Sequence, residues 1–307
     1  MEISVIVPTH NPDQSRLQAT LLGLRAQILP AVQWETIVID NASIQFPEAP
    51  FIADCAPPNL RVVQEPVLGL TAARRCGMRE ARAEIIVFVD DDNVLAPDYL
   101  EQTRAAFSRL AQVGALGGKS LPAFEIEPQI WTKEFWPLLA LRDLGEDELL
   151  SQGLCPSGAD QNRYPLFAPI GAGMAVRRVS LQTWLDRESN LSDRRGKDLT
   201  SSGDNDMVLS IMKAGWEVAY IPKLSLNHLI PASRLTADYL ARLNHGIQKS
   251  WAQVLLAHDA CPWPMILRWT VPLRKLKAWF TYQAWSSSAA RIRWMGSCGH
   301  FEGRAAD

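Results

Sequence analysis

The chain has 307 residues, a formal net charge of -2 and a hydrophobic content of 47%. This length suits one large domain or two modest ones, and the near-neutral charge excludes a protein that binds nucleic acid through an overall polybasic surface. The five cysteines are odd in number and form no C-x-x-C pair, which argues against a disulfide framework or a structural zinc site. No uncharged stretch exceeds 13 residues, whereas a membrane span needs about 18. We therefore expect a cytoplasmic protein, with the inner face of the plasma membrane as a second location.

Strand-like and helix-like segments alternate over the first hundred residues. Short aliphatic runs predict strands at residues 3–7, 36–39, 60–63 and 85–89. Amphipathic spacing predicts helices over residues 13–29 and 70–83. This alternation is typical of an α/β fold with a mostly parallel sheet that helices cover.

The pattern weakens after residue 114 and then resumes. We expect a short acidic helix at residues 145–150, a strand-like run at 169–176, a helix over 204–214 and a strand at 217–221. Helical periodicity dominates from residue 236 onward, interrupted by Pro262, Pro264 and Pro272. The sequence therefore predicts a helical C-terminal extension.

Polar residues follow three of the predicted strands. The segment 8–11 follows the first strand, Asp40 follows the second, and Asp90, Asp91 and Asp92 follow the fourth. Ligands of parallel α/β sheets bind beyond the carboxyl ends of the strands. We therefore expect these side chains to meet at one edge of the sheet.

The three adjacent aspartates are the strongest chemical signal. Carboxylates this close repel one another unless a cation or hydrogen bonds compensate them. Mg²⁺ or Mn²⁺ would do so, and phosphates would complete the coordination shell. The alternative is a solvated acidic turn in which Asp92 or Asn93 caps the next helix.

Two further segments suit a nucleotide. Asp40 can accept hydrogen bonds from a nucleobase or a ribose, although Asp-Asn-Ala-Ser is also an ordinary turn composition. Gly69 opens a helix that carries Arg74 in its first turn, and helix N-termini and arginines both favour a diphosphate. An amphipathic helix with an exposed cationic face is the plainer alternative.

Four motifs, in this order, resemble the family 2 glycosyltransferases of GT-A fold: Val5-Ile-Val-Pro-Thr-His-Asn11, Ile39-Asp40-Asn41, Gly69-x4-Arg74 and Phe88-Val-Asp-Asp-Asp92. A second block agrees: Gly171-Ala-Gly-Met-Ala-Val-Arg177, Ser202-Gly-Asp204-Asn-Asp206, Ala214-Gly-Trp216 and His228-x5-Arg234-Leu235. The resemblance implies a GT-A-like, Rossmann-type domain over residues 1–240, with a nucleotide-binding half to residue 120 and an acceptor half over 121–240. Residues 241–307 would form the extension.

The resemblance also implies roles for individual positions. The nucleotide-sugar site would comprise Pro8, Thr9, Asn11, Asp40, Gly69, Arg74, Asp90, Asp91 and Arg234. Asp92 would bind Mn²⁺ or Mg²⁺ with help from His228, for which a core histidine bonded to the backbone is the alternative. Asp204 matches the general base, although a simple helix N-cap would use the same residue.

The sequence departs from the family pattern near the expected base. Gly203 stands where the family commonly has glutamate, and Asp206 lies two residues beyond Asp204, so the base is open between these two aspartates. The Gln-x-x-Arg-Trp element of processive synthases is missing, which favours a single sugar addition.

The function that this resemblance implies is inverting transfer of a sugar from a nucleoside-diphosphate donor, with UDP-sugar foremost, to a glycan or lipid-linked acceptor hydroxyl. Bacterial polysaccharide assembly is the setting typical of the family. A sugar-phosphate nucleotidyltransferase would need a Gly-x-Gly-x-Arg loop, and Pro8-Thr-His-Asn11 offers none. A catalytically silent membrane-tethered scaffold would not need both Asp92 and Asp204.

The tail has a composition of its own. Residues 260–301 contain six basic side chains, no acidic one and five of the eleven tryptophans, which leaves 25 basic and 33 acidic residues in the rest of the chain. Basic residues beside tryptophans suit a helix that lies in a membrane surface. The alternative is that these tryptophans pack on the catalytic domain or on a second subunit of a homo-oligomer.

Overall fold

The structure is a computed structural model that describes residues 1–151, 164–187 and 199–306. Its strands are β1 (Ile3–Thr9), β2 (Trp34–Asn41), β3 (Leu60–Glu65), β4 (Ile85–Phe88), β5 (Asn93–Leu95), β6 (Val113–Phe124), β7 (Leu149–Leu150), β8 (Ala175–Arg177), β9 (Glu217–Ile230), β10 (Ile266–Leu267) and β11 (Ala305–Ala306). Its α-helices are α1 (Gln14–Arg25), α2 (Ala49–Cys55), α3 (Leu70–Glu80), α4 (Tyr99–Arg109), α5 (Gln182–Asp186), α6 (Gly203–Lys213), α7 (Ala237–Ala257), α8 (Val271–Thr281) and α9 (Ser288–Gly303). Shorter 3₁₀ helices are η1 (Ala31–Gln33), η2 (Ile130–Leu139), η3 (Arg178–Leu181), η4 (Ala232–Leu235) and η5 (Arg268–Thr270).

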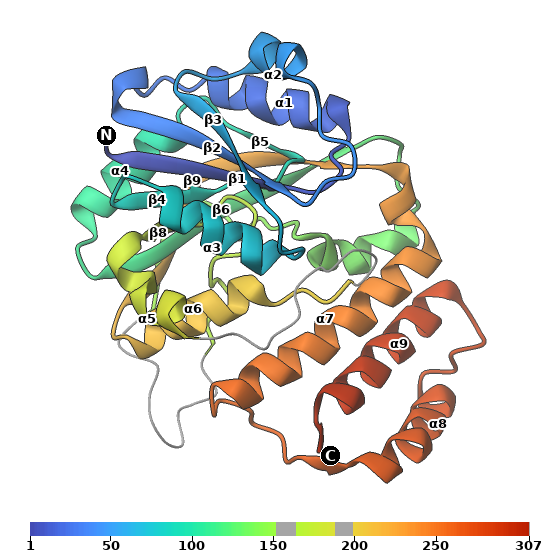
Figure 1. Cartoon of the computed structure of the whole chain (residues 1–307). Helices are drawn as coiled ribbons and strands as arrows, with labels where there is room; N and C mark the ends of the chain where they lie inside the picture. Colours follow the sequence, from blue (N-terminus) through green and yellow to red (C-terminus); the bar gives the residue numbers. More distant parts are fainter. Residues whose placement is uncertain (152–163, 188–198, 307) are drawn as a thin grey trace.

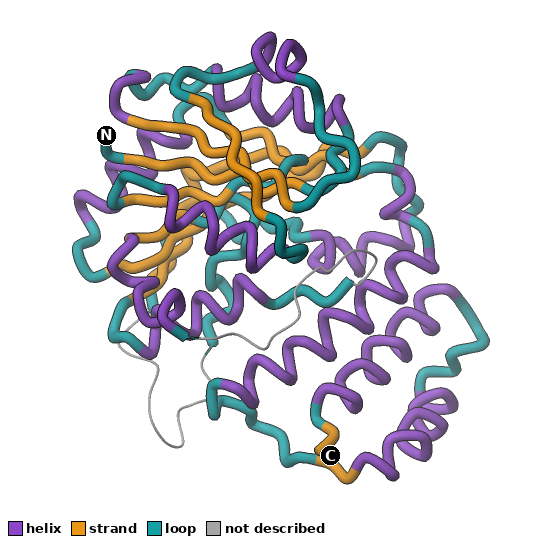
Figure 2. Tube along the Cα trace, in the orientation of Figure 1, coloured by secondary structure: helices purple, strands orange, loops and turns teal. Residues whose placement is uncertain are grey.

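A mixed sheet runs between two layers of helices (Figure 1, Figure 2). In the described part of the chain its strand order is β3-β2-β1-β4-β8-β6-β9-β5, and β7 pairs with β9. Strands β3, β2, β1 and β4 are mutually parallel, whereas β8 runs antiparallel to both of its neighbours. The four strands predicted in the first hundred residues form this parallel half. The predicted GT-A-like fold class is confirmed.

The hydrophobic core lies on both faces of the sheet. Val5 and Val7 belong to the core that includes Leu17 and Leu21 of α1, whereas Ile6 belongs to the core on the other face, which includes Ile211 of α6. Successive side chains of a strand point to opposite faces. A strand buried on both faces therefore needs a near-continuous apolar run, which β1 shows apart from the buried Ser4.

Two predictions of local structure are wrong. The segment 145–150 is not a helix: Gly145 has a φ of +91°, and Leu149 and Leu150 then pair with β9. Most of the run at 169–176 is a turn around Gly173, whose φ is +74°, and only β8 at its end is a strand. Backbone with positive φ belongs to neither a helix nor a strand, and glycine adopts it without a steric cost. The strand expected at 217–221 is confirmed but extends to Ile230.

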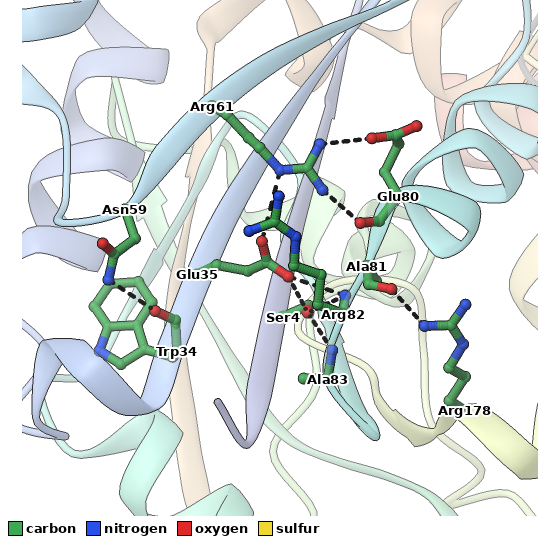
Figure 3. A network of polar contacts seen from close by, with 10 residues as sticks. All are labelled: Ser4, Trp34, Glu35, Asn59, Arg61, Glu80, Ala81, Arg82, Ala83 and Arg178. Atoms are coloured by element: carbon green, nitrogen blue, oxygen red, sulfur yellow. Dashed lines mark hydrogen bonds and ion pairs between the residues drawn. The ribbon is translucent and has the colours of Figure 1, made fainter.

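A buried glutamate holds the edge of the sheet opposite to the carboxyl ends of β1 and β2 (Figure 3). Glu35, which is 2% exposed, accepts hydrogen bonds from the Ser4 hydroxyl at 2.8 Å and the Arg82 backbone N–H at 3.0 Å. The Arg61 side chain lies 3.6 Å from the second Glu35 oxygen and pairs with Glu80 at 2.7 Å. These contacts tie β1, β2, β3 and the end of α3 together, away from the polar residues that follow the strands.

The C-terminal helices form a layer of their own, in which α9 lies beside α7, and α8 lies on the outer side of α9 (Figure 1). Helices α7 and α9 approach closely: a Cβ atom on Gly299 would lie 2.0 Å from the backbone oxygen of His245. The predicted helical extension is therefore present, and the expected boundary between residues 240 and 241 falls inside α7. Within the described residues, no helix combines the length and apolar character that crossing a bilayer requires.

Candidate active site

The carboxyl ends of β1, β2 and β4 open into a cleft of about 430 Å³. From the sheet edge its lining includes Pro8, Thr9, His10, Asn41, Asp90, Asp91, Asp92 and His228. From helices and loops it includes Arg16, Leu70, Ala73, Leu138, Leu139, Ala140, Leu199, Pro231, Ser233, Arg234, Tyr239 and Leu243. One wall is thus charged, and the facing wall, made by η2 and α7, is mostly apolar.

Asp91 carries a strongly perturbed carboxyl group on the charged wall of the cleft. The Thr9 hydroxyl donates a hydrogen bond to its Oδ2 atom. Burial, followed by the charge of Asp92, raises the pKa of Asp91 to about 7, even though the Thr9 hydrogen bond acts in the opposite direction. The site therefore gathers more negative charge than its own cations balance, which is a setting that favours a bound cation.

Asp92, His228 and Arg234 form a second group on the charged wall. Strand β5 pairs with β9 so that Asn93 lies opposite His228, and this register brings His228 beside Asp92. The Arg234 guanidinium lies 2.9 Å from Asp92 Oδ2, and His228 Nε2 lies 3.4 Å from Asp92 Oδ1 and 3.2 Å from Arg234 Nη1. Burial lowers the pKa of Arg234, but the charges of Asp92 and the neighbouring acidic groups together outweigh it and raise the pKa above its ordinary value. The buried Nδ1 of His228 has no hydrogen-bond partner among the described residues.

Arg74 projects from α3, one turn into the helix, toward Asp90. It is 3% exposed, its Nη2 lies 3.4 Å from Asp90 Oδ1, and its guanidinium lies 5.6 Å from the centre of the Phe88 ring. A Cβ atom on Gly171 would lie 2.5 Å from Arg74 Nη2. Glycine at position 171 therefore leaves room for the arginine to reach the rim of the cleft.

Asp204 lies behind this arginine and does not line the cleft. Its carboxylate accepts a hydrogen bond from the Gly171 backbone N–H at 2.9 Å, so Gly171 bridges Asp204 and Arg74. The N-cap of α6 is Ser202, and Asp204 is the second residue of the helix. Asp204 does not take the simple N-cap position considered above.

Asp206 occupies a different, buried environment. It is 1% exposed, and its carboxylate accepts hydrogen bonds from Trp184 Nε1 at 2.8 Å and from the Arg187 side chain, with His258 Nε2 at 2.7 Å. Burial acts to raise the pKa of Asp206, but the His258 hydrogen bond and the Arg187 charge together hold it below its ordinary value. These contacts tie α6 to α5 and to the end of α7.

The remaining predicted residues shape the loops around the cleft. Asp40 lies opposite Thr9 in the sheet, is 6% exposed and accepts the Ser43 backbone N–H at 3.2 Å, but does not line the cleft. Asn11, at a φ of +47°, accepts the Ile44 backbone N–H at 2.8 Å, so its side chain holds the loop after β2. Gly69 precedes α3 with a φ of 142°.

Sequence reasoning missed several residues of the cleft. Asn41 lines it and accepts the Gly69 N–H at 2.8 Å, which joins the end of β2 to the start of α3. The sequence signal that could have identified Asn41 as a residue of the cleft is its position directly after Asp40. No sequence signal indicated the apolar wall, which includes Leu138 and Tyr239, because its members come together only through the packing of η2 against α7.

A divalent cation fits the donor groups of this cleft. Among the residues that the structure describes, no group of three or more histidine, cysteine, aspartate or glutamate side chains is arranged to hold a metal on its own. Mg²⁺ in phosphate-transfer sites, however, is usually bound by one or two carboxylates together with substrate phosphates and water. Asp91 and Asp92 supply hard oxygen donors of this kind, and burial together with the charge of Asp92 raises the pKa of Asp91, an effect that a bound cation would oppose.

Comparison with known proteins agrees with this architecture. Residues 4–184 match the model of the family described as glycosyl transferase family 2. The solved structure of TarS 1-349 from S. aureus superposes with a TM-score of 0.51 and 16% identity, covering 98% of this chain and 90% of that one. Its complexes with UDP and with UDP-GlcNAc give TM-scores of 0.51 and 0.52 at 17% and 16% identity, with the same coverage. No curated protein matches the sequence.

The match spans more than half of the chain and includes β1, β2, β4 and the three adjacent aspartates. The family resemblance seen in the motifs is confirmed, and so is the enzyme class that it implies. The chain belongs to glycosyl transferase family 2 and is a glycosyltransferase.

Proposed function

We propose that this enzyme moves a sugar from a UDP-sugar donor to a hydroxyl of a glycan or lipid-linked acceptor, with inversion at the anomeric carbon. The observation that carries the proposal is the meeting of Asp91, Asp92, His228 and Arg234 in one cleft, beside Arg74. Such a wall suits a diphosphate, because it offers carboxylates for a cation and guanidinium groups for phosphate oxygens. The related fold of TarS has been solved with UDP-GlcNAc, which supports UDP as the nucleotide.

Each residue of the charged wall has a task in donor binding. Arg74 and Arg234 would neutralise the diphosphate as it leaves, which is the point where negative charge develops in the reaction. Thr9 fixes the Asp91 carboxylate through its hydroxyl. Asp40, held by the Ser43 backbone next to the cleft, would accept from the nucleobase after a small change of the 41–45 loop.

Mn²⁺ or Mg²⁺ bound by Asp91 and Asp92, with His228 beside them, would supply Lewis-acid stabilisation of the leaving diphosphate. Arg234 already pairs with Asp92, so this side chain would shift its contact from the carboxylate to a phosphate oxygen when donor binds. The apolar wall, which contains Leu138, Leu243 and Tyr239, would hold the acceptor and exclude water.

The base is better assigned to Asp204 than to Asp206. Asp204 accepts the Gly171 backbone N–H beside Arg74, behind the cleft lining, whereas Asp206 already contacts Trp184, Arg187 and His258 in the interior. A carboxylate in the Asp204 position takes the acceptor proton as the oxygen attacks the anomeric carbon and the diphosphate departs from the opposite side. A single displacement of this type inverts the configuration.

The test separates binding from chemistry with the variant Asp204→Asn. We expect calorimetric affinity for UDP with Mn²⁺ to stay within about twofold of the wild type, while the rate of sugar release from UDP-GlcNAc and other UDP-sugars falls roughly 10²–10⁴-fold. The control is Asp186→Asn, which makes the same change at an aspartate at the end of α5. An Asp204→Asn enzyme with full activity would refute the assignment, and failure of every nucleoside diphosphate to bind would refute the proposed function itself.

A further inference from the structure

Helix α8 presents an apolar face to solvent. Leu273, Leu276 and Phe280 are 62%, 56% and 62% exposed, and Trp285, whose ring centre lies 5.8 Å from that of Phe280, is 58% exposed. We call these four residues the α8 face. Trp279 and Trp294, by contrast, pack against each other between α8 and α9, with their ring centres 4.7 Å apart at an interplanar angle of 82°.

The exposure follows from the helical period. Val271 and Ala278, seven residues apart, are 8% and 6% exposed and turn toward the protein. Leu273, Leu276 and Phe280 follow a spacing of three and four residues, which places them together on the other side of the helix. One face of α8 therefore packs on the protein, and a second, apolar face is exposed to solvent.

Positive charge flanks the α8 face. Arg274 and Lys277 are exposed and each follow an α8 face residue by one position, so they lie beside it on the helix surface. Residues 260–301 contain no acidic side chain. Glu302, just beyond, already contacts Lys275 at 2.5 Å and His245 at 3.2 Å. Leu267 and Trp269, which are 61% and 70% exposed, continue the apolar surface before the helix.

We propose that the α8 face docks on the surface of a bilayer that contains anionic lipid. Leucine, phenylalanine and tryptophan side chains would enter the headgroup boundary, while Arg274 and Lys277 contact lipid phosphates. A second copy of the chain is the weaker occupant, because a two-fold interface sets the same basic residues against themselves. Helix α8 lies on the outer side of α9, away from the sheet (Figure 1), and each residue of the α8 face is more than half exposed. The inference does not depend on the transfer chemistry.

Vesicle co-sedimentation of the full chain tests this. We expect strong pelleting with phosphatidylcholine vesicles that contain phosphatidylglycerol, and roughly tenfold weaker binding to vesicles of phosphatidylcholine alone. The double variant Leu273→Ser with Phe280→Ser and the double variant Arg274→Glu with Lys277→Glu should each lose at least about tenfold of that binding.

Matched control variants carry the same changes elsewhere on the surface. Val32 and Val179 are 79% and 64% exposed and lie outside the cleft, so Val32→Ser with Val179→Ser controls for removal of apolar surface. Arg79→Glu with Lys223→Glu controls for the change of charge, because both side chains are exposed. Calorimetric binding of UDP by every variant reports that the fold is intact.

Two outcomes overturn the proposal. One is binding to anionic vesicles that the α8 face variants retain in full. The other is absence of vesicle binding, and light scattering then tells whether the wild type is a dimer that Leu273→Ser with Phe280→Ser converts to a monomer. In that event the face is an interface between copies of this chain.

Discussion

Arg234 Nη2 lies 2.9 Å from Oδ2 of Asp92, across the junction between η4 and the turn that follows β4. The side chain of Asp92 is 5% exposed and that of Arg234 is 23% exposed, so water screens the pair little. Arg234 thus pairs with Asp92 and Arg74 with Asp90, whereas Asp91 forms no ion pair within 4 Å in the described part of the chain. Burial is the main reason that the pKa of Asp91 rises, and the charge of Asp92 adds to it.

Asp92→Asn should remove the metal-dependent part of donor binding. The amide keeps the size of the carboxylate but loses its charge, so we expect the affinity for UDP in Mn²⁺ to fall at least about tenfold, which corresponds to about 1.4 kcal/mol. Affinity in the presence of a chelator should change much less. Calorimetric titrations in Mn²⁺ and in EDTA measure both, and Asp54→Asn, at an exposed position of α2, is the control.

A contrary result would be informative about Arg234. If Asp92→Asn binds UDP in Mn²⁺ as tightly as the wild type, Asp92 serves to position the arginine and is not a metal ligand. Arg234→Gln would then weaken UDP binding equally in Mn²⁺ and in EDTA.

The parts of the fold that the sequence predicted are those that local patterns determine. Residues 3–7 and 36–39 are mostly aliphatic, apart from the buried Ser4 and Thr36, because both faces of the sheet are buried, and the polar residues after them must lie at its edge. The failures lie where positive-φ glycines interrupt a pattern, as at Gly145 and Gly173. Patterning also cannot show which separated segments meet.

The candidate site shows the same difference between features that local sequence patterns determine and features that packing determines. Asp91, Asp92 and His228 line one cleft, as the sequence led us to expect. His228 lies beside Asp92 because β5 pairs with β9, and the sequence pattern alone does not determine the register of that pairing. The placement of Asp40 and Asp204 behind the lining depends on side-chain packing around Ser43 and Gly171. The sequence left Asp204 and Asp206 open, and their surroundings now distinguish them.

Glu35→Ala should destabilise the protein without touching the cleft. The substitution leaves the Ser4 hydroxyl, the Arg82 N–H and the Arg61 side chain without their shared acceptor in a buried position. Loss of one partner from such a group costs about 3 kcal/mol. The control is Glu134→Ala, because Glu134 pairs with Arg293 at a site where the two side chains are 46% and 47% exposed, and such pairs contribute less than about 1 kcal/mol.

Guanidinium chloride unfolding followed by tryptophan fluorescence compares these two variants. Equal midpoints for Glu35→Ala and Glu134→Ala would contradict the role given to the buried network. Unchanged UDP affinity of the folded Glu35→Ala protein would show that the network supports the sheet and not the site.

Asp206 should make the free energy of unfolding depend on pH in the acidic range. Its pKa lies below the model-peptide value of 3.8 in the folded protein, so the unfolded chain takes up the proton first as the pH falls. The stabilisation is therefore complete well above pH 3.8 and is lost progressively as the pH falls from about 5 through the folded pKa. Asp206→Asn should lower stability at neutral pH, because His258 and Arg187 then lose a charged partner, and should flatten the acid limb of the stability curve. The midpoints of urea unfolding, measured between neutral pH and pH about 4, test this pH dependence, and Asp54→Asn is the exposed control. If the stability of wild type and of Asp206→Asn falls equally steeply as the pH is lowered, other carboxylates govern acid unfolding.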